Sequence, residues 1–324
     1  MQQYDIHEPH DFFEYVRMED DSQPPARRDC IDVALLDMNH SWPNVGHDAL
    51  VHVVLDAACS LRDELARSAK KVRVISYDVR RRNVVPDSPN GRFQLYIGTG
   101  GPGHLDPRLN DGKHEWSQGV EETAEWEAPL FRLYDDILAD ESAAMLAVCH
   151  SFGLVCRWAG IAKPVLRDEK SSGMPLNRLS REAMQHPWFS QFARELPDRQ
   201  HFRVVDNRLF DLILEDARTS VPIAFEAAGS TALTMVELAR SRDGEMPRFL
   251  GVNHHPEIVD REHIMQVLDE KRAHGEVSDQ WYEERAVTLR DLFRDEQERQ
   301  SRLTSRYTLL EPLRHNLARI IRER

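Results

Sequence analysis

The sequence predicts an α/β protein with three layers, in which a mostly parallel sheet is flanked by helices on both faces. Short apolar runs of strand length alternate along the chain with longer segments of helical periodicity. Such alternation is typical of parallel sheets, because the crossover helices cover their faces. Two predicted strands also stop abruptly, one at the glycine-rich segment 98–103 and the other at Cys149. Parallel sheets bind ligands beyond the carboxyl ends of their strands, so these two strand ends indicate where a site would lie.

The composition is that of a globular protein and excludes several functional classes. Of the 324 residues, 41% are hydrophobic and 30% are charged, which argues against disorder. The net charge of −13 argues against binding to nucleic acid, which clustered Lys and Arg would favour. The amino-terminal segment lacks the apolar core of a secretory signal, and no apolar run reaches the roughly 20 residues of a membrane span. We therefore expect a cytoplasmic protein that binds neither membrane nor nucleic acid.

The first half of the chain contains most of the predicted parallel strands. Residues 1–29 are acidic and end near paired prolines, so they predict an extended lead-in. The elements predicted after it are a strand over 31–38, a helix over 48–71, strands over 71–79 and 92–100, a helix over 118–139 and a strand over 145–149. The last strand leads into a segment that can continue as a helix, 152–160.

The second half is less regular. The predicted elements are an irregular polar stretch over 160–200 with a short helix around 180–195, strand segments within 201–214 and a strand over 222–227. Residues 231–239 suit a helix or a strand, but the Asp-Gly turn after them favours a hairpin into 248–257. The segment 260–324 is charged and helical, with breaks near Gly275 and Pro312. We thus predict a lead-in (1–29), a main domain (30–260) and a helical extension (261–324).

The four cysteines do not form a disulfide framework, because they are sparse and none lies in a Cys-x-x-Cys pair. For Cys30, Cys59 and Cys156 we expect small buried thiols. Cys149, in contrast, lies where a buried strand meets a helix. A nucleophile on such a tight turn has a strained backbone and requires small residues two positions before and after it, and Ala147 and Ser151 meet that requirement. A buried strand end without chemistry explains the same residues.

His255 and Glu257 form a second candidate group. In an extended segment, residues two apart point to the same side, so the Glu257 carboxylate can orient the His255 imidazole as in a nucleophile triad. A surface turn is the alternative for this segment, and a packed or solvated imidazole is the alternative for His254. The fifteen histidines are scattered and no His-Glu-x-x-His motif occurs, so we expect no metal site.

The segment 98–103, Gly-Thr-Gly-Gly-Pro-Gly, follows a predicted strand. It matches neither of the glycine patterns that bind nucleotide phosphates, so no nucleotide or other cofactor is expected. Consecutive glycines expose backbone N–H groups, which could stabilise an oxyanion. A plain glycine turn explains the segment equally well.

Together, these three segments resemble those of the class I glutamine amidotransferases, whose triad is Cys, His and Glu. That family has a Gly-Gly-Pro-Gly loop, a Gly-[Ile/Val]-Cys-x-Gly-x-Gln elbow and a Gly-[Val/Ile]-Gln-[Phe/Tyr]-His-Pro-Glu segment, in this order and at comparable separations. The resemblance covers about residues 31–260 and extends to the amidotransferase part of GMP synthetases. It implies a flavodoxin-like fold and the hydrolysis of glutamine to glutamate and ammonia.

The resemblance also implies roles for individual residues. Cys149 matches the nucleophile, His255 the general base and acid, and Glu257 the carboxylate that orients it. The backbone N–H groups of Gly101 and His150 match the donors of the oxyanion hole. The positions assigned to substrate binding are Gly100, Gly153 and Asn253.

Some residues depart from the family pattern. The elbow glycines are Ala147 and Ser151 here, and the glutamine four residues after the nucleophile is Gly153. Because that glutamine helps to hold the substrate, its absence puts the specificity for glutamine in doubt. The Gln and the aromatic residue of the last segment are Asn253 and His254.

Three functions are compatible with the sequence. The first is a glutamine amidotransferase or glutaminase, whose small-molecule substrate is glutamine or a similar amide. The second is a hydrolase or acyltransferase that uses the same scaffold for a different acyl substrate. The third is a catalytically silent binding or regulatory module. The extension 261–324 would serve as a dimer surface, as a docking surface for a synthetase or another acceptor protein, or as a solvated helical cap.

Overall fold

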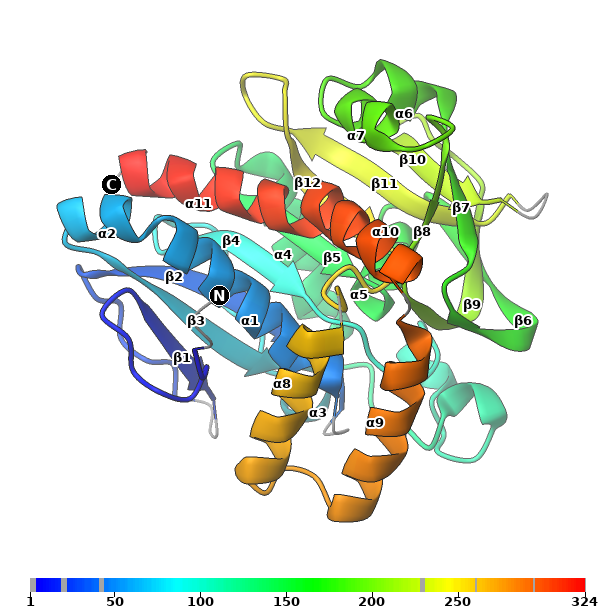
Figure 1. Ribbon diagram of the computed structural model, residues 1–324, viewed down its shortest axis with the longest axis horizontal. Coiled ribbons are helices and arrows are strands. Elements are labelled where there is room, and N and C mark those ends of the chain that lie inside the picture. Colours follow the sequence, from blue (N-terminus) through cyan, green and yellow to red (C-terminus); the bar gives the residue numbers. More distant parts are fainter. Residues whose placement is uncertain are drawn as a thin grey trace.

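The centre of the molecule is a ten-stranded sheet with the strand order β1-β3-β2-β4-β5-β12-β11-β10-β7-β8 (Figure 1). The computed structural model describes residues 4–18, 22–40, 44–227, 231–259, 261–293 and 295–323. The strands of this sheet are β1 (Phe13–Arg17), β2 (Cys30–Asp37), β3 (Lys71–Asp78), β4 (Phe93–Gly98), β5 (Ala144–Val148), β7 (Leu176–Leu179), β8 (His201–Arg203), β10 (Val221–Glu226), β11 (Leu233–Arg240) and β12 (Pro247–Val252). The six strands from β1 to β12 in this order are parallel, and the last four pair antiparallel. The predicted α/β fold with a mostly parallel sheet is confirmed.

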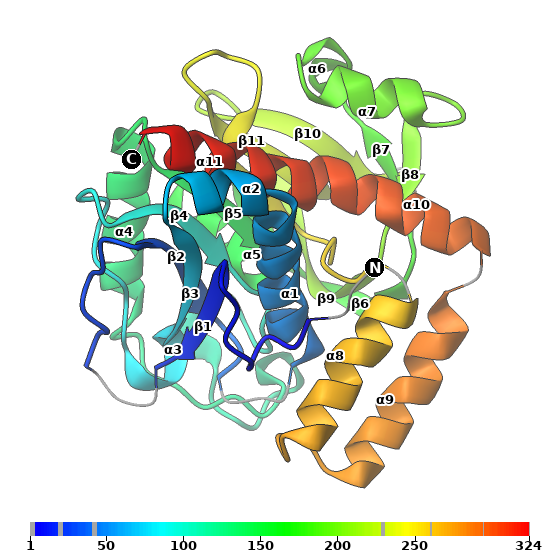
Figure 2. The same cartoon turned by 60° about the vertical axis from the view of Figure 1, so that its left-hand side comes forward.

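Helices cover both faces of the parallel part. On one face α1 (Val45–Ser60) and α11 (Glu311–Glu323) lie side by side, with α2 (Arg62–Arg67) near their ends (Figures 1 and 2). Their apolar side chains share one buried cluster with the facing side of the sheet. On the other face, α4 (Glu127–Ala139) and α5 (His150–Trp158) contribute to a second buried cluster with the opposite side of the same strands.

Two further units stand beside the sheet. One is a two-stranded antiparallel sheet of β6 (Ala162–Gly173) and β9 (Asp206–Leu214). The other is a helical hairpin of α8 (Arg261–Ala273) and α9 (Asp279–Leu292), which projects from the rest of the molecule (Figures 1 and 2). The remaining helices are α3 (Val79–Arg82), α6 (Arg181–Gln185), α7 (Phe189–Glu195), α10 (Asp295–Ser305), two 3₁₀ turns (Pro107–Leu109, Glu115–Ser117) and a π-helical turn (Arg306–Leu310).

Several predicted elements are confirmed, with shifted ends. The strands over 31–38, 71–79, 92–100, 145–149 and 222–227 are present as β2, β3, β4, β5 and β10. The helix over 48–71 is present but starts at Val45 and is interrupted at Leu61. The ambiguous segment 231–239 is strand β11, and it forms the predicted hairpin with β12. The predicted break near Gly275 separates α8 from α9.

Other predicted elements are wrong, for identifiable reasons. The helix predicted over 118–139 starts only at Glu127. Pro129 lies in its first turn, where a proline is tolerated, whereas the same proline would break the interior of the longer predicted helix. The stretch 160–200 is not irregular, since it contains β6 and β7. The strand β6 has exposed residues on both faces, which removes the alternation by which strands are recognised. The lead-in contains β1, which extends the sheet beyond β3.

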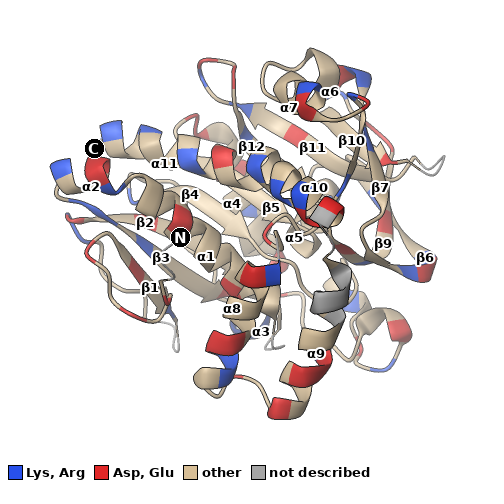
Figure 3. Ribbon diagram, viewed as in Figure 1, with Lys and Arg blue, Asp and Glu red and all other residues tan. Residues whose placement is uncertain are grey.

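The predicted break at Pro312 is also wrong. The π-helical turn before it lets the backbone N–H of Glu311 donate to the carbonyl of Arg306, one residue further back than in an α-helix. A turn of this kind accommodates a proline that would otherwise end the helix. The helical conformation therefore continues from α10 into α11. Charged residues of both signs follow one another along the helices from α8 to α11, as predicted (Figure 3).

All four cysteines are free. Cys30 and Cys156 are buried as expected, whereas Cys59 is only half-buried. Across the described ranges, no helix combines the length and the apolar character that crossing a membrane would require.

Candidate active site

Cys149 lies on a tight turn between β5 and α5, as the sequence predicts. Its backbone has φ +50° and ψ −103°, a conformation that is strained for a residue with a side chain. The backbone N–H of Cys149 donates to the carbonyl of Val252 at 2.8 Å, and Ser151 Oγ donates to the carbonyl of Thr99 at 2.7 Å. These bonds anchor the turn to β12 on one side and to the end of β4 on the other. The turn is crowded, since a Cβ added to Gly98 would lie 2.4 Å from Ser151 Oγ.

His255 and Glu257 follow directly after β12, the strand next to β5. Nδ1 of His255 lies 2.7 Å from Oε1 of Glu257, and the Glu257 side chain is fully buried. The backbone N–H of His255 donates to the carbonyl of Val205 at 2.8 Å, which fixes the segment against the start of β9. The other carboxylate oxygen of Glu257, Oε2, has no hydrogen-bond partner among the described residues. The carboxylate is thus placed to hold one imidazole nitrogen of His255.

Opposing effects set the protonation of His255. Burial by itself lowers its pKa, but the negative charges of Glu257 and of a Cys149 thiolate, together with hydrogen bonds to both side chains, raise the pKa well above its ordinary value. The His255 imidazole thus interacts with both the carboxylate of Glu257 and the sulfur of Cys149. The three side chains form a continuous chain of contacts from sulfur to imidazole to buried carboxylate.

The glycine loop 98–103 lies against both of these residues. A Cβ added to Gly100 would lie 3.0 Å from Cε1 of His255 and 3.4 Å from Cβ of Cys149. A Cβ added to Gly101 would lie 2.1 Å from the carbonyl oxygen of Met38, a clash with backbone that would displace the loop. Glycine is required at 101 because the loop packs directly on the backbone that follows β2.

A buried arginine holds this loop in place. Arg80 donates through Nη1 to the carbonyls of Met38 at 2.9 Å and Pro102 at 2.6 Å. Its Nη2 and Nε donate to the Glu122 carboxylate at 2.6 and 2.9 Å, and both side chains of this pair are essentially inaccessible to water. Arg80 is not predicted from the sequence, because three consecutive arginines after a strand have the pattern of a solvated surface.

His150 occupies the first position of α5, where a helix leaves the backbone N–H without an intrahelical partner. Its side chain is buried against the glycine loop and hydrogen-bonds to the backbone of Gly101. Burial and the nearby charges of Arg80 and His104 lower the pKa of His150 well below its ordinary value, so the imidazole is neutral. The backbone N–H of His150 and the glycine loop therefore lie on either side of Cys149.

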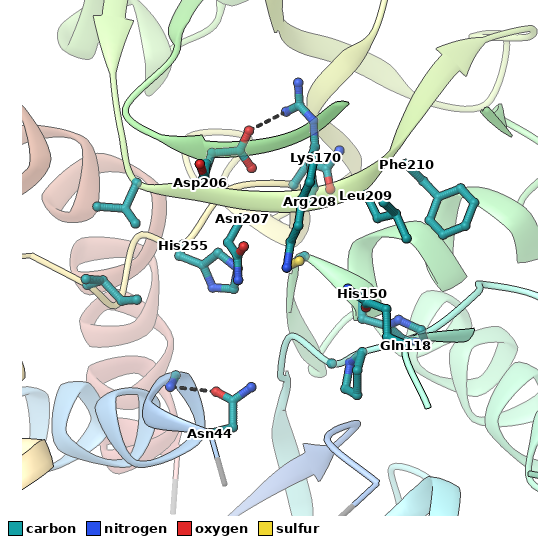
Figure 4. Close-up of a pocket in the computed structure, with 18 of the residues that line it drawn as sticks. Asn44, Gln118, His150, Lys170, Asp206, Asn207, Arg208, Leu209, Phe210 and His255 are labelled. Atoms are coloured by element: carbon teal, nitrogen blue, oxygen red, sulfur yellow. Dashed lines mark hydrogen bonds and ion pairs between the residues drawn. The ribbon is translucent and has the colours of Figure 1, made fainter. Parts of the chain in front are cut away.

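Gly101, Cys149, His150 and His255 line a cavity of about 590 Å³ (Figure 4). One wall comes from β6 and β9, with Lys170, Asp206 and Arg208, and another from α9, with Trp281 and Arg285. Asn44, at the start of α1, lies on the side of the cavity opposite Asp206 and Arg208. None of these wall residues is predicted from the sequence. The sequence instead predicts an irregular stretch where β6 lies and a separate extension over 261–324.

Three buried side chains of the cavity present polar atoms without a hydrogen-bond partner among the described residues. These atoms are His150 Nε2, Asp206 Oδ1 and Asn253 Nδ2. Leaving such atoms unpaired costs about 1–3 kcal/mol each. Each of the three atoms is inaccessible to solvent, although the residues that carry them line the cavity. Asn253, predicted to contact substrate, is one of the three.

Gly153 also lines the cavity, but leaves no room for a larger side chain. A Cβ added there would lie 2.5 and 2.6 Å from the two methyl groups of Leu105. Leu105 is 5% exposed and packs with Phe152 and Cys156 in a buried cluster, so it cannot easily move aside. The space that a Gln side chain would need at this position is taken by Leu105.

The chain is similar to known proteins in its fold. No protein-family model matches the sequence, and no curated protein sequence matches it. A glutamine amidotransferase from Thermotoga maritima has a similar structure, with a TM-score of 0.50 and 13% identity over 90% of this chain and 98% of that chain. For a glutamine amidotransferase from Methylobacillus flagellatus the TM-score is 0.49, with 14% identity over 90% of this chain and 95% of that one. A putative GMP synthase subunit from Thermoplasma acidophilum gives 0.42 and 14%, over 76% of this chain and 98% of that one. The fold is thus flavodoxin-like and of the class I glutamine amidotransferase type, as the sequence predicts.

Proposed function

We propose that this protein is a cysteine amidohydrolase that releases ammonia from glutamine or a related amide. The observation that carries the proposal is the contact chain from Cys149 through His255 to the buried carboxylate of Glu257. A cysteine on a strained strand-to-helix turn, with an oriented imidazole beside it, is the arrangement of an activated nucleophile.

In the proposed mechanism the Cys149 thiolate attacks the carbonyl carbon of the amide. The backbone N–H groups of Gly101 and His150 stabilise the negative charge that develops on the carbonyl oxygen. Protonated His255 donates its proton to the departing nitrogen, so that ammonia leaves and an acyl thioester remains on Cys149. The same imidazole then removes a proton from water, which attacks the thioester and regenerates the free thiol. Glu257 keeps His255 in the required orientation throughout.

The proposed test is the release of ammonia from L-glutamine by the purified full chain, with Cys149→Ala as the matched variant. We expect turnover in the unchanged chain and its loss in the variant, with an unchanged circular dichroism spectrum. Turnover that persists in Cys149→Ala would exclude Cys149 as the nucleophile. If neither protein releases ammonia while Cys149 reacts rapidly with iodoacetamide, the nucleophile acts on a different substrate.

A specific observation favours a second candidate, a hydrolase or acyltransferase for a different acyl group. Leu105 fills the space beyond Gly153, where the resemblance would require a glutamine that holds the substrate. The test is to compare glutamine with a panel of amides and esters in the unchanged chain and in Gly153→Gln/Leu105→Ala. A gain of glutamine hydrolysis in the double variant, with loss of another substrate, would support this second function. If the unchanged chain hydrolyses glutamine and the double variant does so equally or more weakly, glutamine is favoured as the substrate of the unchanged chain.

Ammonia that reaches water becomes protonated and no longer acts as a nucleophile. We therefore also propose that an acceptor protein binds close to the cavity. The hairpin of α8 and α9 borders the cavity and is the surface that such a partner would contact.

A further inference from the structure

A second group of side chains with ligand chemistry lies where the amino-terminal segment meets the turn between α8 and α9. Its members are Asp5, His7, His274 and Glu276, and none of them lines the cavity at Cys149. One ligand atom from each of Asp5, His7 and His274 lies within 4.8 Å of the others. Nε2 of His274 is 3.4 Å from Oδ2 of Asp5, and Nε2 of His7 is 3.9 Å from Oε1 of Glu276. The imidazole ring centroids of the two histidines are 4.2 Å apart.

Each carboxylate in this group has one oxygen fixed and the other directed to a histidine. Oδ1 of Asp5 accepts the backbone N–H of His7 at 2.8 Å, which leaves Oδ2 facing His274. Oε2 of Glu276 accepts from Nζ of Lys271 at 2.9 Å, which leaves Oε1 facing His7. Hydrogen bonds of this kind orient the ligands of protein metal sites.

The charge around the group suits a divalent cation. Lys271 is buried, and Asp48 lies 2.6 Å from its Nζ, so the ammonium that holds Glu276 is itself paired. The carboxylates of Asp5 and Glu276 supply negative charge to the group, and the Arg17 guanidinium also interacts with Glu276. Two imidazoles and two carboxylates are donors that zinc and similar transition metals accept, whereas magnesium and calcium prefer oxygen ligands alone.

We propose that Asp5, His7, His274 and Glu276 form a binding site for a zinc-like transition metal ion. Tetrahedral zinc, with bonds of about 2.0–2.2 Å, requires its ligand atoms to lie about 3.3–3.5 Å apart. One ligand atom from each of Asp5, His7 and His274 lies within 4.8 Å of the other two, and His274 Nε2 already lies 3.4 Å from Asp5 Oδ2. Glu276 Oε1 lies 3.9 Å from His7 Nε2. All four residues are half-buried or exposed, so side-chain rotations would bring their ligand atoms together. The two halves of the site lie more than 260 residues apart in sequence, so no local motif indicates it.

The position of the site gives the ion a structural role. Bound metal would join the segment 5–7 to the turn that connects α8 with α9. The helix α9 supplies Trp281, Arg285 and Leu289 to the cavity wall. Metal binding would therefore hold the hairpin, and with it one wall of the candidate active site, in a fixed position.

The test measures Zn²⁺ binding to the full chain by competition with a chromophoric chelator. The measurement is made in the Cys149→Ala background, so that zinc cannot bind the thiol at His255. We expect one Zn²⁺ per chain, and at least about a tenfold loss of affinity in His7→Gln/His274→Gln. Zn²⁺, but not Mg²⁺, should raise the melting temperature of the parent and leave that of the double variant unchanged.

The matched control is His201→Gln, because His201 is an exposed histidine paired with Asp198 at 2.7 Å elsewhere on the molecule. This control should bind Zn²⁺ as tightly as the parent. Asp5→Asn, which keeps the shape of the side chain, should weaken binding without altering the circular dichroism spectrum. Stoichiometric binding that is equally tight in the double variant, or no binding by the parent at micromolar zinc, would overturn the proposal. Neither outcome depends on amide hydrolysis, so the metal site and the proposed function are tested separately.

Discussion

His255 shows how a single residue combines burial with charge. Burial of its imidazole disfavours protonation, yet the buried carboxylate of Glu257 and the sulfur of Cys149 outweigh that effect and raise the pKa. The ion pair with Glu257 thus stabilises the protein fully at pH values below the unfolded pKa of histidine, about 6.5. This contribution is lost as the pH rises through the higher pKa of the folded state.

The substitution Glu257→Gln tests this balance. It removes the largest charge that raises the pKa of His255, so the imidazolium should lose its proton at a lower pH than in the unchanged chain. The amide would also favour the wrong imidazole tautomer, and we expect turnover to fall by up to about 10⁴-fold. The measurement is the pH dependence of Cys149 alkylation by iodoacetamide, together with kcat. Identical pH profiles would show that Glu257 does not control His255; Glu141→Gln, at an exposed position, serves as the control.

At the scale of single residues, sequence reasoning succeeds where the signal is local. Cys149, His255 and Glu257 are candidates because a turn between small residues and a two-residue spacing can be read over a few positions, and the family resemblance implies their roles. Arg80 and Asp206 cannot be assigned in this way. Their environments depend on contacts with residues 22 to 42 positions away, such as Pro102, Glu122 and Ser171.

The glycine loop is held in position by a side chain of the neighbouring helix α3. Arg80, at the start of α3, bonds to the carbonyl of Pro102 within the loop and to that of Met38 beneath it. If the loop supplies an oxyanion donor, its position matters, because the loss of one such donor raises the barrier by about 2.7–4 kcal/mol. Arg80 is thus a positioning residue that acts through the loop.

We predict that Arg80→Met will destabilise the protein by about 3–5 kcal/mol, because it leaves the buried Glu122 carboxylate without its cationic partner, although Asn110 Nδ2 and Trp126 Nε1 still donate hydrogen bonds to it. The variant should also lower kcat more than it changes KM, since a displaced oxyanion donor affects the transition state. The neighbouring Arg81, which forms a partly exposed pair with Asp78, provides the control; Arg81→Met should cost less than about 1 kcal/mol. Urea unfolding and steady-state kinetics measure both effects. Equal midpoints for the two variants would contradict the role given to Arg80.

The elements that the sequence predicts well are those buried on both sides or on one regular face. Strands β2, β3 and β5 are apolar runs because both faces of a central parallel strand are covered. Strand β6 escaped prediction because it pairs only with β9, and most of its side chains are not fully buried. That pair forms a wall of the cavity, so this part of the candidate site was also the part least visible in the sequence.

At the scale of the whole molecule, the strand order brings the predicted segments together. The glycine loop follows β4, Cys149 follows β5 and His255 follows β12, and these three strands are adjacent and parallel in the sheet. Their carboxyl ends therefore meet at one edge, where α/β sheets bind ligands. The sequence predicted this common edge for the first two segments from the alternation of elements. The position of β12 next to β5 could not be deduced, because it is set by tertiary pairing across about 100 residues.

The carboxyl-terminal helix α11 shows that composition alone does not reveal whether a helix belongs to the core. Residues 261–324 are highly charged, and this pattern predicted a separate helical extension that serves as a docking or dimer surface or as a solvated helical cap. In α11, however, the buried residues recur on one face, where Leu313, Leu317 and Ile320 are at most 1% exposed. They belong to the same buried cluster as α1 and the parallel strands. The helix is therefore part of the core, although most of its sequence is polar.

Deletion of residues 311–324 should consequently prevent folding. The four aliphatic side chains of α11, including Ile321, each contribute about 1.5–3 kcal/mol by burial, or about 6–12 kcal/mol together. That sum is comparable to the total stability of a typical protein, about 5–15 kcal/mol, so we expect an insoluble product without a cooperative melt. Leu317→Ala should instead cost about 2–5 kcal/mol and leave a folded protein in which Cys149 still reacts with iodoacetamide. Solubility and thermal melting by circular dichroism measure both. A soluble truncated chain that melts within a few degrees of the full chain would mean that α1 and the sheet are stable without α11, and that the helix is the peripheral extension its composition suggested.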